Sequence, residues 1–181
     1  RLNTSNAAGR SAVKVLALDG VMIALSVVLT RFLSLNIPIG GGIGARVGLG
    51  HLPIIFTGIV LGPVHGFIVG AIADAVGETL WPSGPFIWQI TAISALSGVI
   101  PALFMRASLP RSRVARMWIG ITVSRLLLSV TWLPFVLHAA IRLPYWPVLA
   151  GQAAGSAIMI PMTAFLIGIL LQSYERAGFG R

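Results

Sequence analysis

The chain has 181 residues, of which 56% are hydrophobic and only 9% charged, and its mean hydropathy is +0.93. A soluble globular domain carries about 25% charged residues, so this class is excluded, and the lack of cysteine excludes a disulfide-stapled secreted module. The formal net charge of +9 comes from 13 basic and 4 acidic residues. We therefore interpret the chain as an integral membrane protein. Its basic residues indicate which segments lie on the cytoplasmic side, and we expect them to have no role in binding nucleic acid.

Six membrane-spanning helices are predicted along the chain, because one span needs about 20 apolar residues. We expect one all-α membrane domain over residues 1–181, with a cytoplasmic tail at 1–12. Pro63 separates the second span, which is short, from the third, since proline lacks a backbone N–H and favours a turn there. The expected helices are 13–33, 48–61, 63–80, 88–106, 114–137 and 147–172.

Basic residues in short loops indicate the orientation of such a protein, because they concentrate on the cytoplasmic side. With the N-terminus inside, the cytoplasmic segments contain Arg1, Arg10, Lys14, Arg106, Arg111, Arg113, Arg116, Arg176 and Arg181. The outer segments contain Arg31, Arg46 and Arg142. Both termini are therefore predicted to be cytoplasmic.

Several kinds of chemistry are excluded by missing motifs, so we expect no enzyme activity, no cofactor and no metal. The single lysine, Lys14, lies between two valines and not in a phosphate-binding loop, which excludes ATP hydrolysis by this chain. His51, His65 and His138 have no metal-ligand spacing. The glycine run at 40–44 matches a dinucleotide-binding pattern but lacks the surrounding strand and helix, so a mobile loop explains it.

The charged residues inside the apolar segments are the candidates for function, because a charge at this depth is costly and usually faces a cavity or a partner. Asp74 and Arg125 each lie 11 residues into a helix that starts at the cytoplasmic side, or about 16 Å deep. They are placed either to pair or to contact a ligand. Glu78 follows Asp74 by one turn, and Arg31 and Arg46 bracket the first outer loop. Together these residues predict an outward-facing pocket.

Other polar and aromatic residues have simpler explanations. Asp19, near the inner boundary, is expected to be solvated or to cap a helix. An aromatic belt explains tryptophans near the outer boundary, although any that turn inward would stack on a flat heterocycle. These tryptophans are Trp81, Trp88, Trp132 and Trp146.

Small residues recur at four-residue spacing, a pattern that allows close helix approach in lipid. The series Gly58, Gly62, Gly66 and Gly70 is expected to pack internally. Because the chain lacks an energy source of its own, one such surface is expected to dock a partner that has one. We assign that role to Ala17, Gly20 and Ala24 of the first helix.

The motifs of the second and third helices are similar to those of a known family. They run from Arg46-Val-Gly-Leu-Gly-His-Leu-Pro53 through Gly58, Leu61-Gly-Pro63, Gly66, Gly70, Ala73-Asp74 and Gly77 to Pro82-Ser-Gly84. The chain thereby resembles the S components of energy-coupling factor (ECF) vitamin transporters, with the folate-specific branch the nearest. The resemblance covers about residues 15–165 and is strongest over 46–84.

This resemblance implies the membrane-embedded, substrate-binding subunit of an importer in the plasma membrane of a prokaryote. Such a subunit captures a vitamin from the outside and topples in the bilayer to release it, after docking on a transmembrane coupling protein and two ATPase subunits. Ala17, Gly20 and Ala24 would form the docking surface. The gate over the pocket would be the loop with Gly40, Gly41, Gly42 and Gly44.

For folate or a related pterin, the resemblance suggests which residues bind each part of the ligand. Asp74 or Glu78 would accept from the pterin amino group, Trp88 or Trp132 would stack on the ring, and Arg31 and Arg46 would bind the carboxylates. Arg125 completes the candidate site, together with Gln152, where folate-type members often have arginine. That substitution leaves another B vitamin or precursor as an alternative.

Two further classes stay open on the sequence alone. An autonomous ion-coupled transporter would use Asp74 and Glu78 as a proton or sodium site. A structural membrane protein would use every internal charge for packing.

Overall fold

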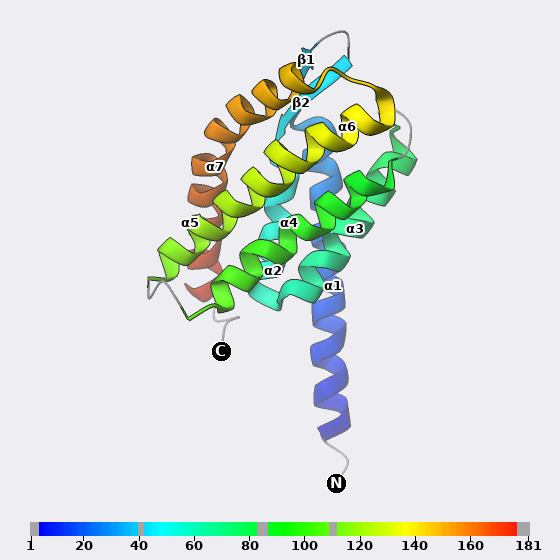
Figure 1. Cartoon of the computed structure of the whole chain (residues 1–181). Helices are drawn as coiled ribbons and strands as arrows, with labels where there is room; N and C mark the ends of the chain where they lie inside the picture. Colours follow the sequence, from blue (N-terminus) through cyan, green and yellow to red (C-terminus); the bar gives the residue numbers. More distant parts are fainter. Residues whose placement is uncertain (1–3, 40–41, 83–86, 109–111, 177–181) are drawn as a thin grey trace.

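Helices make up most of the computed structural model, which describes residues 4–39, 42–82, 87–108 and 112–176, with side chains from residue 13 onward except at 35–39 and 42–47 (Figure 1). Two antiparallel strands follow the first helix. The elements are α1 (Thr4–Phe32), β1 (Ser34–Ile39), β2 (Gly42–Gly48), α2 (His51–Leu61), α3 (Pro63–Leu80), α4 (Trp88–Arg106), α5 (Arg113–Ser124), η1 (Arg125–Trp132), α6 (Leu133–Ile141) and α7 (Tyr145–Arg176).

Helix α1 is longer than the sequence suggested. Residues 4–12, which we expected in a cytoplasmic tail, are helical, because this stretch contains alanine and no proline and so continues the helix without a break. The N-terminal part of α1 extends beyond the other helices, on the side of the molecule where the described chain also ends (Figure 1).

The segment between α1 and α2 is a β-hairpin where we expected only a loop. Ser34 pairs with Gly48 and Ile39 with Gly42, and the register is interrupted between Ile37 and Pro38. The sequence alternates apolar, mostly β-branched residues on both sides of the glycine run, which favours strands. The hairpin lies at the end of the molecule opposite the start of α1 and the end of α7 (Figure 1).

Four of the described helical segments are long and apolar enough to cross a membrane, which supports a helical membrane fold with the hairpin as its only correction among the described residues. They are Val13–Phe32, Trp88–Arg106, Arg113–Ile141 and Tyr145–Arg176. Helix α2, with 11 residues, spans only about 16 Å. Helix α3 contains polar and charged residues that lower its hydropathy. The four segments therefore match four of the six predicted spans.

The third of these segments is one continuous rod made of α5, η1 and α6. Its middle, η1, is a π-helix, in which the backbone N–H of Leu133 donates to the carbonyl of Leu128 five residues earlier. Pro134 follows at once, at the start of α6. The sequence predicted a regular helix here.

Helices α2, α3 and α4 meet through glycines with almost no side chain between their backbones. A Cβ added at Gly70 would lie 2.5 Å from the carbonyl oxygen of Ser94, and one added at Gly98 would lie 2.8 Å from that of Gly66. Both distances are too short for a real Cβ contact. The glycine spacing of the sequence is therefore an internal packing seam, as predicted.

A cluster of apolar side chains fills the molecule at the end away from the hairpin. It joins α2, α5 and α7 and contains Leu52, Ile55, Phe56, Met117, Ile121, Ala164, Ile167 and Leu171. Large apolar residues such as Leu16, Phe135 and Phe165 instead face outward. In a bilayer these exposed side chains contact lipid tails, as the composition requires.

Asp19 is buried, contrary to the solvated position that we expected. Its side chain has 8% exposure, and its Oδ2 lies 2.7 Å from Nδ1 of His65 in α3. A buried charge needs a partner, and His65 supplies one. This contact ties the middle of α1 to α3.

Candidate functional site

A cavity of about 310 Å³ lies between the helices on the hairpin side of the apolar cluster. Its walls combine an apolar surface with a few polar groups, the composition typical of small-molecule sites. The polar and charged lining residues are Ser26, Thr30, Arg31, Ser34, His51, Asp74, Glu78, Thr91, Ser94, Arg125, Ser129 and Gln152. They come from α1, β1, α2, α3, α4, η1 and α7.

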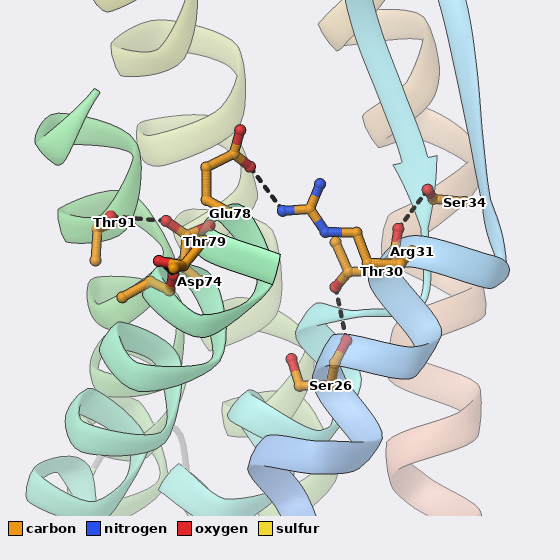
Figure 2. A network of polar contacts seen from close by, with 10 residues as sticks. Ser26, Thr30, Arg31, Ser34, Asp74, Glu78, Thr79 and Thr91 are labelled. Carbon is orange, nitrogen blue, oxygen red and sulfur yellow. Dashed lines mark hydrogen bonds and ion pairs between the residues drawn. The ribbon is translucent and has the colours of Figure 1, made fainter. Parts of the chain in front are cut away.

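One ion pair joins two walls of this cavity. The guanidinium Nη2 of Arg31, in the last turn of α1, lies 2.6 Å from Oε2 of Glu78 in α3 (Figure 2). Their side chains are only 10% and 20% exposed. Because each charge is largely balanced by the other, this pair holds α1 against α3 at the cavity wall.

Asp74 is held by two hydroxyl groups from α4. The hydroxyl of Thr91 donates to Oδ2 at 2.7 Å (Figure 2). The hydroxyl of Ser94 donates to Oδ1 at 3.2 Å. Each carboxylate oxygen has two lone-pair sites, so each oxygen can accept one more hydrogen bond. Asp74 is thus oriented and still able to bind a donor in the cavity.

Arg125 begins η1 and also lines the cavity. Among the residues that the structure describes, no hydrogen bond or ion pair involves its guanidinium, and it is not paired with Asp74. An arginine presents five N–H donors in a planar fork. In this position those donors are available to an oxygen-bearing group of a ligand.

The wall that carries Arg125 follows a simple spacing. Arg125, Ser129, Leu133, Leu137 and Ile141 are each four residues apart, and all five line the cavity. In an α-helix, with 3.6 residues per turn, residues four apart lie slightly more than one turn apart. In a π-helix, whose turn is wider, they lie slightly less than one turn apart. The change from η1 to α6 therefore keeps all five residues on one face.

The structure brings together five of the eight predicted binding residues. Arg31, Asp74, Glu78, Arg125 and Gln152 line the cavity.

The two predicted stacking residues lie elsewhere: Trp88 is 67% exposed and Trp132 is 54% exposed, and neither lines the cavity. Their amphipathic rings are placed as in the aromatic belt of a membrane interface.

The remaining predicted binding and gating residues fall in the hairpin region. Gly40 and Gly41, and the side chain of Arg46, lie outside the described part of the structure. Gly42, Gly44 and the backbone of Arg46 belong to β2, where Arg46 pairs with Asn36.

The predicted docking residues lie on the outside of α1. Ala17, Gly20 and Ala24 are all exposed, and a Cβ added at Gly20 would meet no atom within 4 Å.

The hydroxyl-bearing residues of the cavity were not identified from the sequence. Thr91 and Ser94 are three residues apart and therefore share a helix face, a signal that could have linked them to Asp74. Ser129 follows Arg125 by four residues and shares its helix face by the same rule, so this spacing could have linked it to Arg125.

Comparisons with known proteins agree with one another on the type of protein. Residues 10–176 match the family model described as ECF-type riboflavin transporter, S component. The chain is 30% identical over 159 residues to the folate transporter FolT of Clostridium novyi (strain NT), covering 86% of each sequence. A crystal structure of FolT bound with folic acid superposes with a TM-score of 0.70, at 23% identity, over 86% of this chain and 90% of that one.

Proposed function

Because this chain belongs to the family of ECF-type riboflavin transporter S components, we propose that its cavity captures a vitamin of the folate or pterin type. The chain is then the substrate-specific subunit of an importer in a prokaryotic plasma membrane. The FolT relative is named as a folate transporter. The family description names riboflavin, so the chemistry of the cavity has to distinguish the two ligands.

Asp74 is the observation that favours a pterin. The aminopyrimidinone edge of folate presents two adjacent donors, the amino group and the neighbouring ring N–H, which match the two oxygens of a carboxylate. The corresponding edge of riboflavin has one N–H between two carbonyl groups, which would be repelled by a carboxylate. A carboxylate oriented by Thr91 and Ser94 therefore selects the pterin.

The cations of the cavity have different roles in this proposal. Arg31 is already bound to Glu78 and keeps the wall in place. Arg125 donates to an oxygen of the ligand, either the ring carbonyl or a carboxylate. Gln152, which is buried in α7, offers an amide with both donor and acceptor groups.

The remaining parts of the proposal follow from the position of the cavity. The apolar cluster lies between the cavity and the end of the molecule where α1 begins and α7 ends. With both termini cytoplasmic and the six helices crossing the membrane as one domain, the cavity opens outward beneath the hairpin. The exposed small residues of α1 then dock on the coupling protein, and the ATPase subunits drive toppling and release.

The test is isothermal titration of the purified protein with folic acid and with riboflavin. We expect the wild type to bind folic acid and not riboflavin. Asp74→Asn keeps the shape of the side chain but replaces one acceptor by a donor, so the affinity for folic acid should fall about 100-fold, the equivalent of two charge-assisted hydrogen bonds. Glu175→Gln makes the same change at an exposed residue that pairs with Arg113, and should leave the affinity unchanged.

Each outcome has a definite meaning. Binding of riboflavin but not folic acid would overturn the pterin assignment and keep the S-component family. Equal affinity of the wild type and Asp74→Asn would remove Asp74 from the site.

A further inference from the structure

The backbone of η1 leaves one carbonyl group of the cavity wall without its usual partners. The carbonyl of residue 129 would accept from residue 133 in an α-helix or from residue 134 in a π-helix. The N–H of Leu133 is taken, because it donates to the carbonyl of Leu128. Residue 134 is proline and has no N–H to donate. Ser129 therefore loses both helical donors at once.

This carbonyl belongs to a residue of the cavity lining. Ser129 lies in the wall between Arg125 and Leu133. A backbone carbonyl buried in a membrane protein without a donor costs free energy, and native structures avoid this arrangement unless a side chain, water or ligand supplies the donor. Among the described residues, no side chain donates to Ser129.

We propose that the backbone carbonyl of Ser129 is a hydrogen-bond acceptor for an N–H group of the bound ligand. The inference rests on the proposed function, since it adds a second acceptor to the cavity already assigned to the vitamin. Asp74 and Ser129 lie on different walls and accept from different N–H groups of the ligand. Pro134 acts as a positioning residue: it never contacts the ligand but keeps this acceptor open.

A carbonyl acceptor has a consequence for specificity. A carboxylate such as Asp74 can be protonated or replaced by an amide, whereas a backbone carbonyl accepts hydrogen bonds whatever side chain stands at position 129. A ligand with an oxygen in place of the recognised N–H would leave this carbonyl without a hydrogen-bond donor. Its oxygen would also lie against the carbonyl, and two acceptors repel each other. The site thus distinguishes N–H from oxygen at one ring position.

The test restores the missing donor. Pro134→Ala and Pro134→Val both introduce an N–H at residue 134, and valine replaces most of the volume of the buried proline ring. Both variants should bind folic acid about tenfold more weakly in isothermal titration, because the new N–H competes for the Ser129 carbonyl. Pro161→Ala restores an N–H in α7, away from the cavity lining, and should keep the wild-type affinity. Ser129→Ala keeps this carbonyl and removes only the hydroxyl, so it separates the two possible acceptors of residue 129.

A second readout follows the carbonyl itself. In protein labelled with 1-¹³C serine, the difference between the infrared spectra of the wild type and Ser129→Ala isolates the carbonyl band of residue 129. This band should move when folic acid binds, and it should lie at a lower wavenumber in ligand-free Pro134→Ala than in the ligand-free wild type.

The possible results separate this inference from the proposed function. If the wild type binds folic acid but Pro134→Ala and Pro134→Val bind it equally well, the carbonyl acceptor is wrong and the proposed function stands. Loss of affinity in Ser129→Ala alone would identify the hydroxyl as the acceptor and overturn the inference. If the wild type binds neither folic acid nor riboflavin, the proposed function fails, and an unchanged carbonyl band in Pro134→Ala would overturn the inference as well.

Discussion

The charged residues of the cavity differ in how far their charges are already balanced. Arg31 and Glu78 neutralise each other at 2.6 Å, and Asp74 accepts two hydroxyl hydrogen bonds. The guanidinium of Arg125 has no such partner within the described residues. A buried charge without a partner is costly, so Arg125 has the most to gain from a ligand oxygen.

At Arg125 we expect a substitution to affect binding far more than folding. Arg125→Gln removes the charge but keeps a polar side chain, and the affinity for folic acid should fall about 10- to 100-fold, as for the loss of a charged hydrogen bond. Isothermal titration measures the change. Arg113→Gln, at an exposed residue of α5, is the matched control. Unchanged affinity in Arg125→Gln would show that its guanidinium does not contact the ligand.

The sequence predicted the charged residues of the site better than its neutral ones. Asp74, Glu78, Arg31 and Arg125 were recognisable because a charge in an apolar segment is rare. Thr91, Ser94 and Ser129 were not, since hydroxyl groups are common in membrane helices and carry no such signal. Which charges pair was also not predictable: the partner of Glu78 is Arg31, 47 residues away in the chain, and this contact depends on how α1 packs against α3.

The glycine seam makes a prediction for the elements α2, α3 and α4. Gly70→Ala places a Cβ against the carbonyl of Ser94, whose hydroxyl holds Asp74. Overpacking of this kind lowers the free energy of unfolding by about 1–3 kcal/mol, and the shift of α4 should also weaken the binding of folic acid. Unfolding in mixed micelles and titration measure the two effects.

A second glycine controls for the size of the substitution. Gly168→Ala in α7 adds the same methyl group where its nearest neighbour is Cε of Met117 at 3.8 Å. That variant should keep its stability and its affinity. Equal stability of Gly70→Ala and Gly168→Ala would show that the seam tolerates a side chain.

Among the elements, the long helices followed from apolar length alone, but the hairpin and η1 did not. A glycine-rich segment beside a membrane domain is compatible with a loop or a hairpin, and pairing is decided by the neighbouring helices that support the strands. A π-helix has no sequence signature of its own. Pro134 was visible in the sequence, but its effect on the carbonyl of Ser129 required the hydrogen-bond pattern of η1.

For the whole molecule, the outer face of α1 is the surface that we assign to the partner subunits. Gly20→Leu should leave folding and the affinity for folic acid unchanged, because a side chain at this position points into open space. It should reduce the amount of coupling protein and ATPase that co-purifies with the chain, since close helix approach requires a small residue. Ala154→Leu adds the same side chain at an exposed position of α7 and should keep the complex intact. Normal assembly of Gly20→Leu would place the docking surface on another face.

The membrane class, the helical fold and the family could all be read from composition and motifs, because they depend on properties summed over the chain. The size and walls of the cavity could not, since these depend on how elements far apart in the sequence, from α1 to α7, meet.

The backbone contact between α2, α3 and α4 divides the molecule into two mechanically different halves. Where backbones touch directly, no layer of side chains can change rotamer to absorb a displacement, so these three helices move as one stiff block. The wall formed by η1 and α6 is more flexible. Its helical hydrogen bonds are interrupted at Pro134, so the rod can bend there at little cost in free energy. We therefore expect η1 and α6 to move when a vitamin enters the cavity. Asp74 belongs to the stiff block of α2, α3 and α4 and keeps its position.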